Sequence, residues 1–104
     1  MSSKMLKFVT TQKETPPKRD ASQRVDDFDE IYDDFELKTA EDQASRCSQC
    51  GVPFCQTNCP LHNNIPDGLM LTAEGRMEEA YRLSSQTNNM PEICGRICPQ
   101  DRLC

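Results

Sequence analysis

The sequence contains no tryptophan, only one histidine, His62, and four glycines that are dispersed along the chain. A single histidine excludes zinc sites built on two cysteines and two histidines, and also a Rieske centre, because each needs a pair of histidines. The scattered glycines form neither a GxGxxG nor a Walker motif, so no phosphate-binding loop is predicted. No paired carboxylates and no nucleophile with a neighbouring base stand out. The sequence therefore predicts no catalytic centre in this chain.

The sequence also lacks a long apolar run. No segment of 18 apolar residues occurs, and residues 1–20 lack the apolar core of a signal peptide. We therefore predict a cytoplasmic protein with no membrane partner. The net charge is −5, and nine acidic residues but only one basic residue, Lys38, lie between Asp26 and Asp42. This distribution predicts no nucleic-acid partner, and we interpret the acidic stretch as a solvated helix face or, alternatively, a docking surface for a basic partner.

Apolar side chains are scarce for a chain of 104 residues, at 36% hydrophobic and 6% aromatic. This length allows one small domain, and burial alone barely offsets the conformational entropy that folding removes. Cysteine is abundant by contrast: all seven cysteines lie in the last 58 residues. An odd number excludes complete pairing, and in a reducing cytoplasm dense cysteines indicate metal binding or redox chemistry rather than structural disulfides.

The cysteines form two sets. The first lies in RCSQCGVPFCQTNCP and the second in ICGRICPQDRLC; their members are Cys47, Cys50, Cys55 and Cys59, then Cys94, Cys98 and Cys104. Closely spaced thiolates reach several corners of an iron–sulphur cluster, and a proline after the last cysteine, as at Pro60 and Pro99, turns the chain away from it. Zinc sites with four cysteines typically use two CxxC pairs, and one is present here. The spacing favours iron–sulphur ligation, with zinc and metal-free cysteines as alternatives.

Residues 1–20 show no sustained period and are predicted to form an extended N-terminal arm. A helical pattern of apolar residues begins after this arm. Apolar residues on one helical stripe predict a helix that starts at Asp20 or Ser22. The stripe consists of Val25, Phe28, Ile31, Tyr32 and Phe35. A second short helix is expected from Thr39, as its N-cap, to Arg46. Glycine and prolines in the first cysteine set predict a loop there.

Three further helices are predicted. The first starts after Asn64 and ends at Gly75, the second runs from Arg76 to about Ser85, and the third starts at Pro91, carries Cys94 and Cys98, and ends at Pro99. No stretch alternates with a period of two. The predicted fold class is all-α, a small helical domain over residues 21–104 with cysteine-bearing loops.

The segments RCSQCGVPFC, NCP, NNIPD, EGRMEEAY and NNMPEICGRICPQDRLC together resemble the N-terminal iron–sulphur domain of the small (beta) subunit of bacterial NADPH-dependent glutamate synthase. The N-terminal domain of dihydropyrimidine dehydrogenase is a more distant relative. The resemblance implies an α-helical ferredoxin-like fold with two 4Fe-4S clusters. It implies electron transfer from NADPH and FAD, bound to the flavin domain of the parent subunit, to the large (alpha) subunit. There glutamate is formed from 2-oxoglutarate and glutamine.

The same resemblance implies how the cysteines divide between the clusters. Cys47, Cys50 and Cys55 would bind the first cluster, Cys59, Cys98 and Cys104 would bind the second, and Cys94 would bind neither. One further ligand per cluster, and the FAD and NADPH domains, lie downstream of Cys104 in the family. We therefore expect a truncated chain whose clusters are incomplete or absent in isolation. The competing hypothesis is a zinc-binding interaction module without redox activity.

Overall fold

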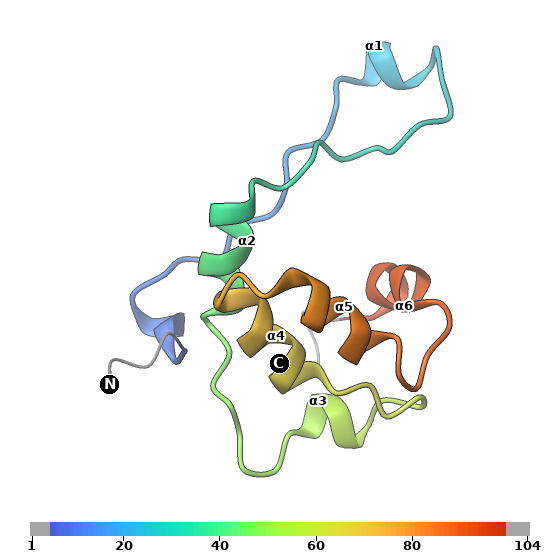
Figure 1. Cartoon of the computed structure of the whole chain (residues 1–104). Helices are drawn as coiled ribbons and strands as arrows, with labels where there is room; N and C mark the ends of the chain where they lie inside the picture. Colours follow the sequence, from blue (N-terminus) through green and yellow to red (C-terminus); the bar gives the residue numbers. More distant parts are fainter. Residues whose placement is uncertain (1–4, 100–104) are drawn as a thin grey trace.

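The computed structural model describes residues 5–99, which Figure 1 shows as short helices joined by long connections. In chain order the elements are the 3-10 helix η1 (Lys7–Val9) and the α-helices α1 (Ala21–Arg24), α2 (Leu37–Ala44), α3 (Phe54–Thr57), α4 (Ile65–Ala73), α5 (Met77–Ser84) and α6 (Pro91–Ile97). Extended pairing among these residues is limited to one isolated antiparallel bridge, between Lys18 and Tyr32. The predicted all-α class is confirmed. None of the described helices has the length and apolarity to cross a membrane.

Helix α4 lies at the centre of the packing, because α2, α3 and α5 all contact it. Its start is fixed by the sequence. The side chain of Asn64 accepts a hydrogen bond from the backbone N–H of Asp67 at 3.3 Å, and Pro66 lies in the first turn. An asparagine cap satisfies one of the free N–H groups of a helix end, and proline there loses no helical hydrogen bond. The predicted start of this helix is confirmed.

Gly75 ends α4 and also lets α2 approach. Its φ of 77° lies in the left-handed region, where a side chain is strained, and the N–H of Arg76 donates back to the carbonyl of Leu71 at 2.9 Å. A Cβ at this position would lie 3.0 Å from the Oε1 atom of Glu41 on α2. Glycine therefore serves both the turn and the close packing of the two helices, and the predicted helix end is confirmed.

A small core forms where the N-terminal segment meets α2 and α4. Met5, which is 7% exposed, packs with the buried Ala44 and Ala73. Partly buried side chains complete this cluster, namely Cys47, Leu69 and Met70. The backbone ties the segment down as well, since the N–H of Leu6 donates to the carbonyl of Cys47 at 3.1 Å. The N-terminal segment therefore contacts the chain at the first cysteine.

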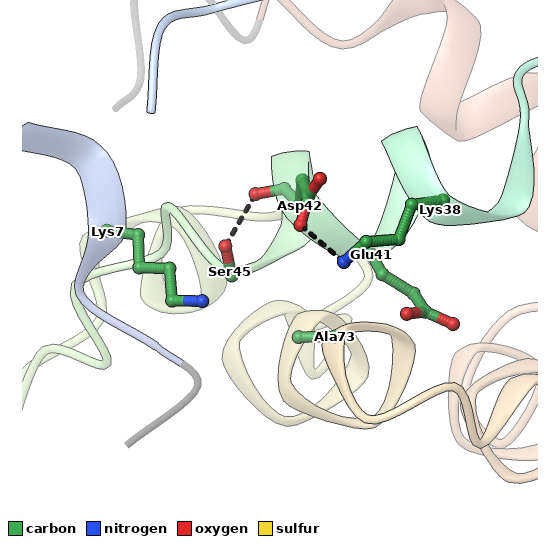
Figure 2. Close-up of a pocket in the computed structure, with 6 residues that line it drawn as sticks. All are labelled: Lys7, Lys38, Glu41, Asp42, Ser45 and Ala73. Carbon is green, nitrogen blue, oxygen red and sulfur yellow. Dashed lines mark hydrogen bonds and ion pairs between the residues drawn. The ribbon is translucent and has the colours of Figure 1, made fainter. Parts of the chain in front are cut away.

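Figure 2 shows the side chains that line a pocket, called here the hollow, at this junction. Its lining consists of Lys7, Lys38, Glu41, Asp42, Ser45 and Ala73. Asp42 already holds two of these side chains: Lys38 Nζ lies 3.0 Å from its Oδ1 atom, and the hydroxyl of Ser45 donates to its carbonyl at 2.5 Å. The hollow contains no cysteine, so it marks the seam between η1, α2 and α4 rather than part of the predicted metal site.

The amphipathic helix predicted for the acidic stretch is wrong beyond its first turn. Only the four residues of α1 are helical, and the chain then folds back on itself, so that residues 17–36 form a hairpin, called here the acidic arm. The N–H of Arg19 donates to the carbonyl of Ile31, and the N–H of Asp33 to the carbonyl of Pro17, each at 2.8 Å. Figure 1 shows the acidic arm projecting away from α4 and α5.

The physical reason is that the apolar stripe packs against little of the described chain. Phe28 is 109% exposed and Val25 82% exposed, so a helix here would gain little from tertiary burial, from which most helices draw their stability. Arg19 instead holds the hairpin through both oxygens of Asp27, at 3.1 and 2.6 Å, and keeps the pKa of that carboxyl below its ordinary value. Ion pairing therefore replaces burial in this part of the chain.

Three other boundaries complete the comparison with the predictions. Helix α2 starts at Leu37 instead of after Thr39, so the predicted capping by Thr39 is wrong. The first cysteine segment is not wholly a loop, because the short helix α3 begins directly after Pro53, its N-cap. The predicted helices that correspond to α5 and α6 are confirmed.

We predict that Met5→Ala lowers the free energy of unfolding by about 2 to 3 kcal/mol, because it empties the centre of a very small core. Val9→Ala is the matched control: Val9 lies in the same segment but is 73% exposed, so a change within about 0.5 kcal/mol is expected. Urea unfolding followed by circular dichroism measures both. Equal effects of the two substitutions would show that the N-terminal segment does not contribute to the core.

Candidate metal centre

Six of the seven cysteines fall within the described residues, and they lie on three pieces of the fold. Cys47 follows α2, Cys50 lies in the loop after it, Cys55 lies within α3, Cys59 follows α3, Cys94 lies within α6, and Cys98 caps the end of α6. Five of them are half-buried and Cys50 is exposed. Cys104 lies outside the described residues, so its predicted role stays a prediction.

No disulfide links the cysteines between residues 5 and 99. Between residues 5 and 99, no three His, Cys, Asp or Glu side chains gather closely enough to hold a single metal ion. A 4Fe-4S cluster is a larger object with several iron atoms, so its cysteine ligands do not need to meet at one point. The way in which the cysteines divide between clusters therefore remains a prediction.

Cys47 accepts hydrogen bonds at both its backbone carbonyl and its sulphur. Its carbonyl accepts the N–H of Leu6, as described above, and its Sγ atom accepts a hydrogen bond from Gln49 Nε2 at 3.4 Å. The same nitrogen of Gln49 donates to the carbonyl of Pro66 in the first turn of α4 at 2.8 Å. Gln49 thus links the first cysteine to the central helix. Its φ of 50° is unusual for a residue other than glycine.

Cys59 lies in a turn that directs N–H groups at its sulphur. The turn closes when the N–H of His62 donates to the carbonyl of Cys59 at 2.9 Å, and His62 has a left-handed φ of 51°. The backbone N–H of Asn63 is the main cause of a lowered pKa of the Cys59 thiol; burial opposes it, and the N–H groups of Leu61 and His62 assist. Asn63 Nδ2 also donates to the sulphur, at 3.4 Å. This environment favours a thiolate.

Helix α6 carries the second pair of described cysteines and is tied to the acidic arm. Cys94 and Cys98 are one helical turn apart, and the N–H of Cys98 donates to the carbonyl of Cys94 at 3.1 Å. Between them, Arg96 Nη1 donates to Glu30 Oε1 at 3.0 Å, across 66 residues of sequence. Arg96 also pairs with Glu92 on its own helix. The ion pair with Glu30 therefore positions α6 relative to the arm.

These sulphur environments fit an iron–sulphur cluster. Thiolates are the ligands that iron–sulphur clusters use, and hydrogen bonds to their sulphur atoms are a recurrent feature that tunes them. Cys47 and Cys59 each accept such a bond from a side-chain amide, and Cys59 also accepts backbone N–H groups. The fit therefore rests on the N–H donors around the sulphur atoms and not on how the cysteines group in space.

Comparison with known proteins decides between the alternatives. Residues 24–104 match the family described as dihydropyrimidine dehydrogenase domain II, 4Fe-4S cluster. The chain belongs to this family. This membership confirms the predicted resemblance and favours an iron–sulphur cluster over the zinc alternative, and it identifies residues 24–104 as an iron–sulphur domain.

Relatives extend the match across the whole chain. The glutamate synthase (NADPH) small chain of Azospirillum brasilense is 63% identical over 103 residues, which are 99% of this chain and 21% of that relative. The corresponding small chain of Escherichia coli K12 is 50% identical over 104 residues, 22% of its length, and that of Halomonas elongata 47% identical over 99 residues, 21% of its length. The chain thus spans about a fifth of the length of these relatives.

Sequence reasoning missed the amide donors of this site. Cysteine spacing identified the thiols, but Gln49 and Asn63 have no signature that would distinguish them from ordinary polar loop residues. Both depend on backbone conformations with positive φ, at Gln49 itself and at His62 beside Asn63. The signal that was available is the asparagine pair Asn63-Asn64, which we used only to place the start of a helix.

We predict that Arg96→Met raises the pKa of Glu30 toward its ordinary value, because the hydrogen bond from Arg96 is the main cause of its lowering. A lowered carboxyl pKa stabilises the fold above the unfolded pKa, and this contribution is lost as the pH falls through the folded pKa. The stability of the parent protein should therefore decline more between about pH 5 and pH 3 than that of Arg96→Met.

The measurement is an NMR titration of the Glu30 carboxyl group together with unfolding at each pH. Arg82→Met is the matched control, since Arg82 pairs with Glu78 on α5 and should leave the titration of Glu30 unchanged. An unchanged Glu30 titration in Arg96→Met would contradict the ion pair between α6 and the arm.

Proposed function

We propose that this chain is the iron–sulphur electron-transfer domain of an NADPH-dependent glutamate synthase small subunit. The observation that carries the proposal is the identity of 63% with a glutamate synthase small chain over 99% of this chain. The membership of residues 24–104 in a 4Fe-4S family supports the same conclusion. In this role the chain would receive electrons from NADPH through FAD in the flavin domain. They would pass to a large subunit that forms glutamate from 2-oxoglutarate and glutamine, in the cytoplasm.

The ligands of two clusters follow from the resemblance. Cys47, Cys50 and Cys55 would hold the first cluster, and Cys59, Cys98 and Cys104 the second. When bound, a 4Fe-4S cluster supplies a one-electron redox centre. The chain itself contributes thiolates, N–H groups that stabilise the charge at Cys59 and, for the described ligands other than Cys50, half-buried positions that limit the access of water.

The packing supports an interleaved arrangement. Helix α3 carries Cys55 and is followed directly by Cys59, so the short segment around α3 would supply ligands to both clusters. Because α3 contacts the central helix α4, both ligands are attached to the most highly connected part of the fold. Clusters that share one rigid support keep a fixed separation, which electron transfer between them requires.

The acidic arm supplies the surface for a partner. Residues 17–36 contain eight of the 17 acidic side chains and three of the 12 basic ones, a net charge of −5 that equals the net charge of the whole chain. The acidic side chains without an ion pair among the described residues are exposed: Asp20, Asp26, Asp29, Asp33, Asp34 and Glu36. Phe28 and Val25 project from the same arm. This combination suits a basic surface of the large subunit that also accepts apolar side chains.

We predict that a full-length chain, meaning residues 1–104 carried in a chain as long as the small-chain relatives, contains two 4Fe-4S clusters when it is isolated without oxygen or reconstituted with iron and sulphide. Cys98→Ser should lose the second cluster, whereas Cys94→Ser should keep both, although the two cysteines lie one turn apart on α6. Cys59→Ser should lose the same cluster as Cys98→Ser, and Cys55→Ser the other one. Iron and acid-labile sulphide analysis with electron paramagnetic resonance of the reduced protein measures these outcomes.

Two results would contradict this assignment. Zinc in the purified protein without acid-labile sulphide would support the interaction module instead. Loss of a cluster in Cys94→Ser but not in Cys98→Ser would exchange the roles of the two cysteines on α6.

We also predict that the double substitution Asp33→Lys and Asp34→Lys weakens binding to the large subunit at low salt by about tenfold or more, since it reverses two unpaired charges on the acidic arm. The control is Glu78→Lys with Glu92→Lys, an equal change in charge on α5 and α6. Binding measured at 50 and 300 mM salt should differ between the two variants only at the lower concentration. Equal weakening by both pairs would show that the arm is not the docking surface.

A further inference from the structure

Two side-chain amides in the described chain donate hydrogen bonds to cysteine sulphur. Gln49 Nε2 lies 3.4 Å from Cys47 Sγ, and Asn63 Nδ2 lies 3.4 Å from Cys59 Sγ. The proposed function, on which this inference rests, assigns these two sulphur atoms to different clusters. Each cluster would then have an amide donor of its own.

Gln49 is held in place independently of the sulphur. Its Nε2 atom donates to the carbonyl of Pro66 at 2.8 Å, and Pro66 is buried at the start of α4. The φ of 50° at Gln49 costs conformational energy in a residue other than glycine. Such strained conformations persist where the surrounding structure enforces them, and they cluster at functional sites. Here the strained backbone directs the amide toward both the helix and the sulphur.

Unlike Gln49, Asn63 has no second hydrogen bond that holds its side-chain amide to the described chain. Its Oδ1 atom is buried and has no hydrogen-bond partner among the described residues, so the sulphur of Cys59 is the contact that its side chain makes. A buried polar atom without a partner is costly. The cost is offset when the Nδ2 atom of the same amide donates to a charged sulphur, because hydrogen bonds to ions are about twice as strong as those between neutral groups.

We propose that Gln49 and Asn63 are tuning residues that each raise the reduction potential of one cluster, Gln49 through Cys47 and Asn63 through Cys59. Reduction adds an electron to a cluster whose sulphur ligands are already negative. An N–H donor stabilises the added charge and therefore favours the reduced state. Two separate donors let the chain set the two potentials separately, and with them the direction in which an electron moves between the clusters.

The experiment uses the full-length chain with its clusters and measures the midpoint potential of each cluster by redox titration with electron paramagnetic resonance. The variants are Gln49→Met and Asn63→Leu, which have similar volume and no donor. The signals are assigned to the clusters with Cys55→Ser and Cys98→Ser. We expect each variant to raise the ratio of oxidised to reduced protein severalfold at a fixed potential for its own cluster only. The upper bound is about tenfold, which corresponds to about 59 mV for one electron.

Gln43→Met is the matched control. Gln43 also holds the chain through its amide, which donates to the carbonyl of Gln12 at 2.9 Å and accepts the N–H of Glu14 at 3.0 Å, but no cysteine sulphur is among its partners. A merely structural effect of losing an amide should therefore appear in Gln43→Met as well. We expect both midpoint potentials to stay unchanged in this variant.

Gln49→Glu and Asn63→Asp keep the shape of each side chain and serve where the apolar variants do not fold; they should shift the potentials in the same direction. Unchanged potentials in variants that retain both clusters would overturn the inference while leaving the proposed function intact. A shift of both clusters by each variant would overturn the separate tuning. A parent protein without acid-labile sulphide would overturn the proposed function itself.

Discussion

The packing of α2 against α4, with Met5 between them, is the interaction on which the rest of this small structure depends. The core contains few large side chains, and Met5 fills the space that Ala44 and Ala73 leave between the two helices. The same cluster includes Cys47, so the packing that stabilises the fold also fixes the first cysteine. From α4 the structure reaches the other sites: Pro66 accepts the hydrogen bond of Gln49, and α3 with Cys55 contacts the same helix.

The parts of the fold that were predicted correctly are those where a residue's own chemistry decides its conformation. Asn64 caps a helix because its side-chain oxygen replaces a missing partner, and Gly75 ends one because glycine alone adopts its φ without strain. The stripe from Val25 to Phe35 was wrong for the converse reason. A segment with an apolar helical stripe becomes a helix where another surface buries the stripe. The sequence of this segment alone does not reveal whether such a surface is present.

The candidate site follows the same division. The thiols were identified from their spacing, because a cluster demands cysteine at close intervals, and the family comparison confirmed the chemistry. The donors that surround the thiols were not identified, because they depend on a left-handed backbone at Gln49 and His62. Neither glutamine nor histidine is a residue type that predicts this conformation. The grouping of the cysteines by cluster came from resemblance and not from spacing, because sequence distance does not determine which loops meet in space.

Charge distribution explains why backbone and amide dipoles matter so much here. The segment between Arg46 and Asp67, which carries four of the cysteines, contains no aspartate, glutamate, lysine or arginine, while the acidic arm holds a net charge equal to that of the whole chain. Apart from Arg46, which directly precedes Cys47, the thiolates in this segment therefore have no lysine or arginine beside them in the sequence to offset their charge. N–H groups, such as those of Asn63 around Cys59, are the stabilisers that the local chain supplies. Such short-range dipoles act on one sulphur at a time, so they suit the separate tuning of neighbouring cysteines that we propose.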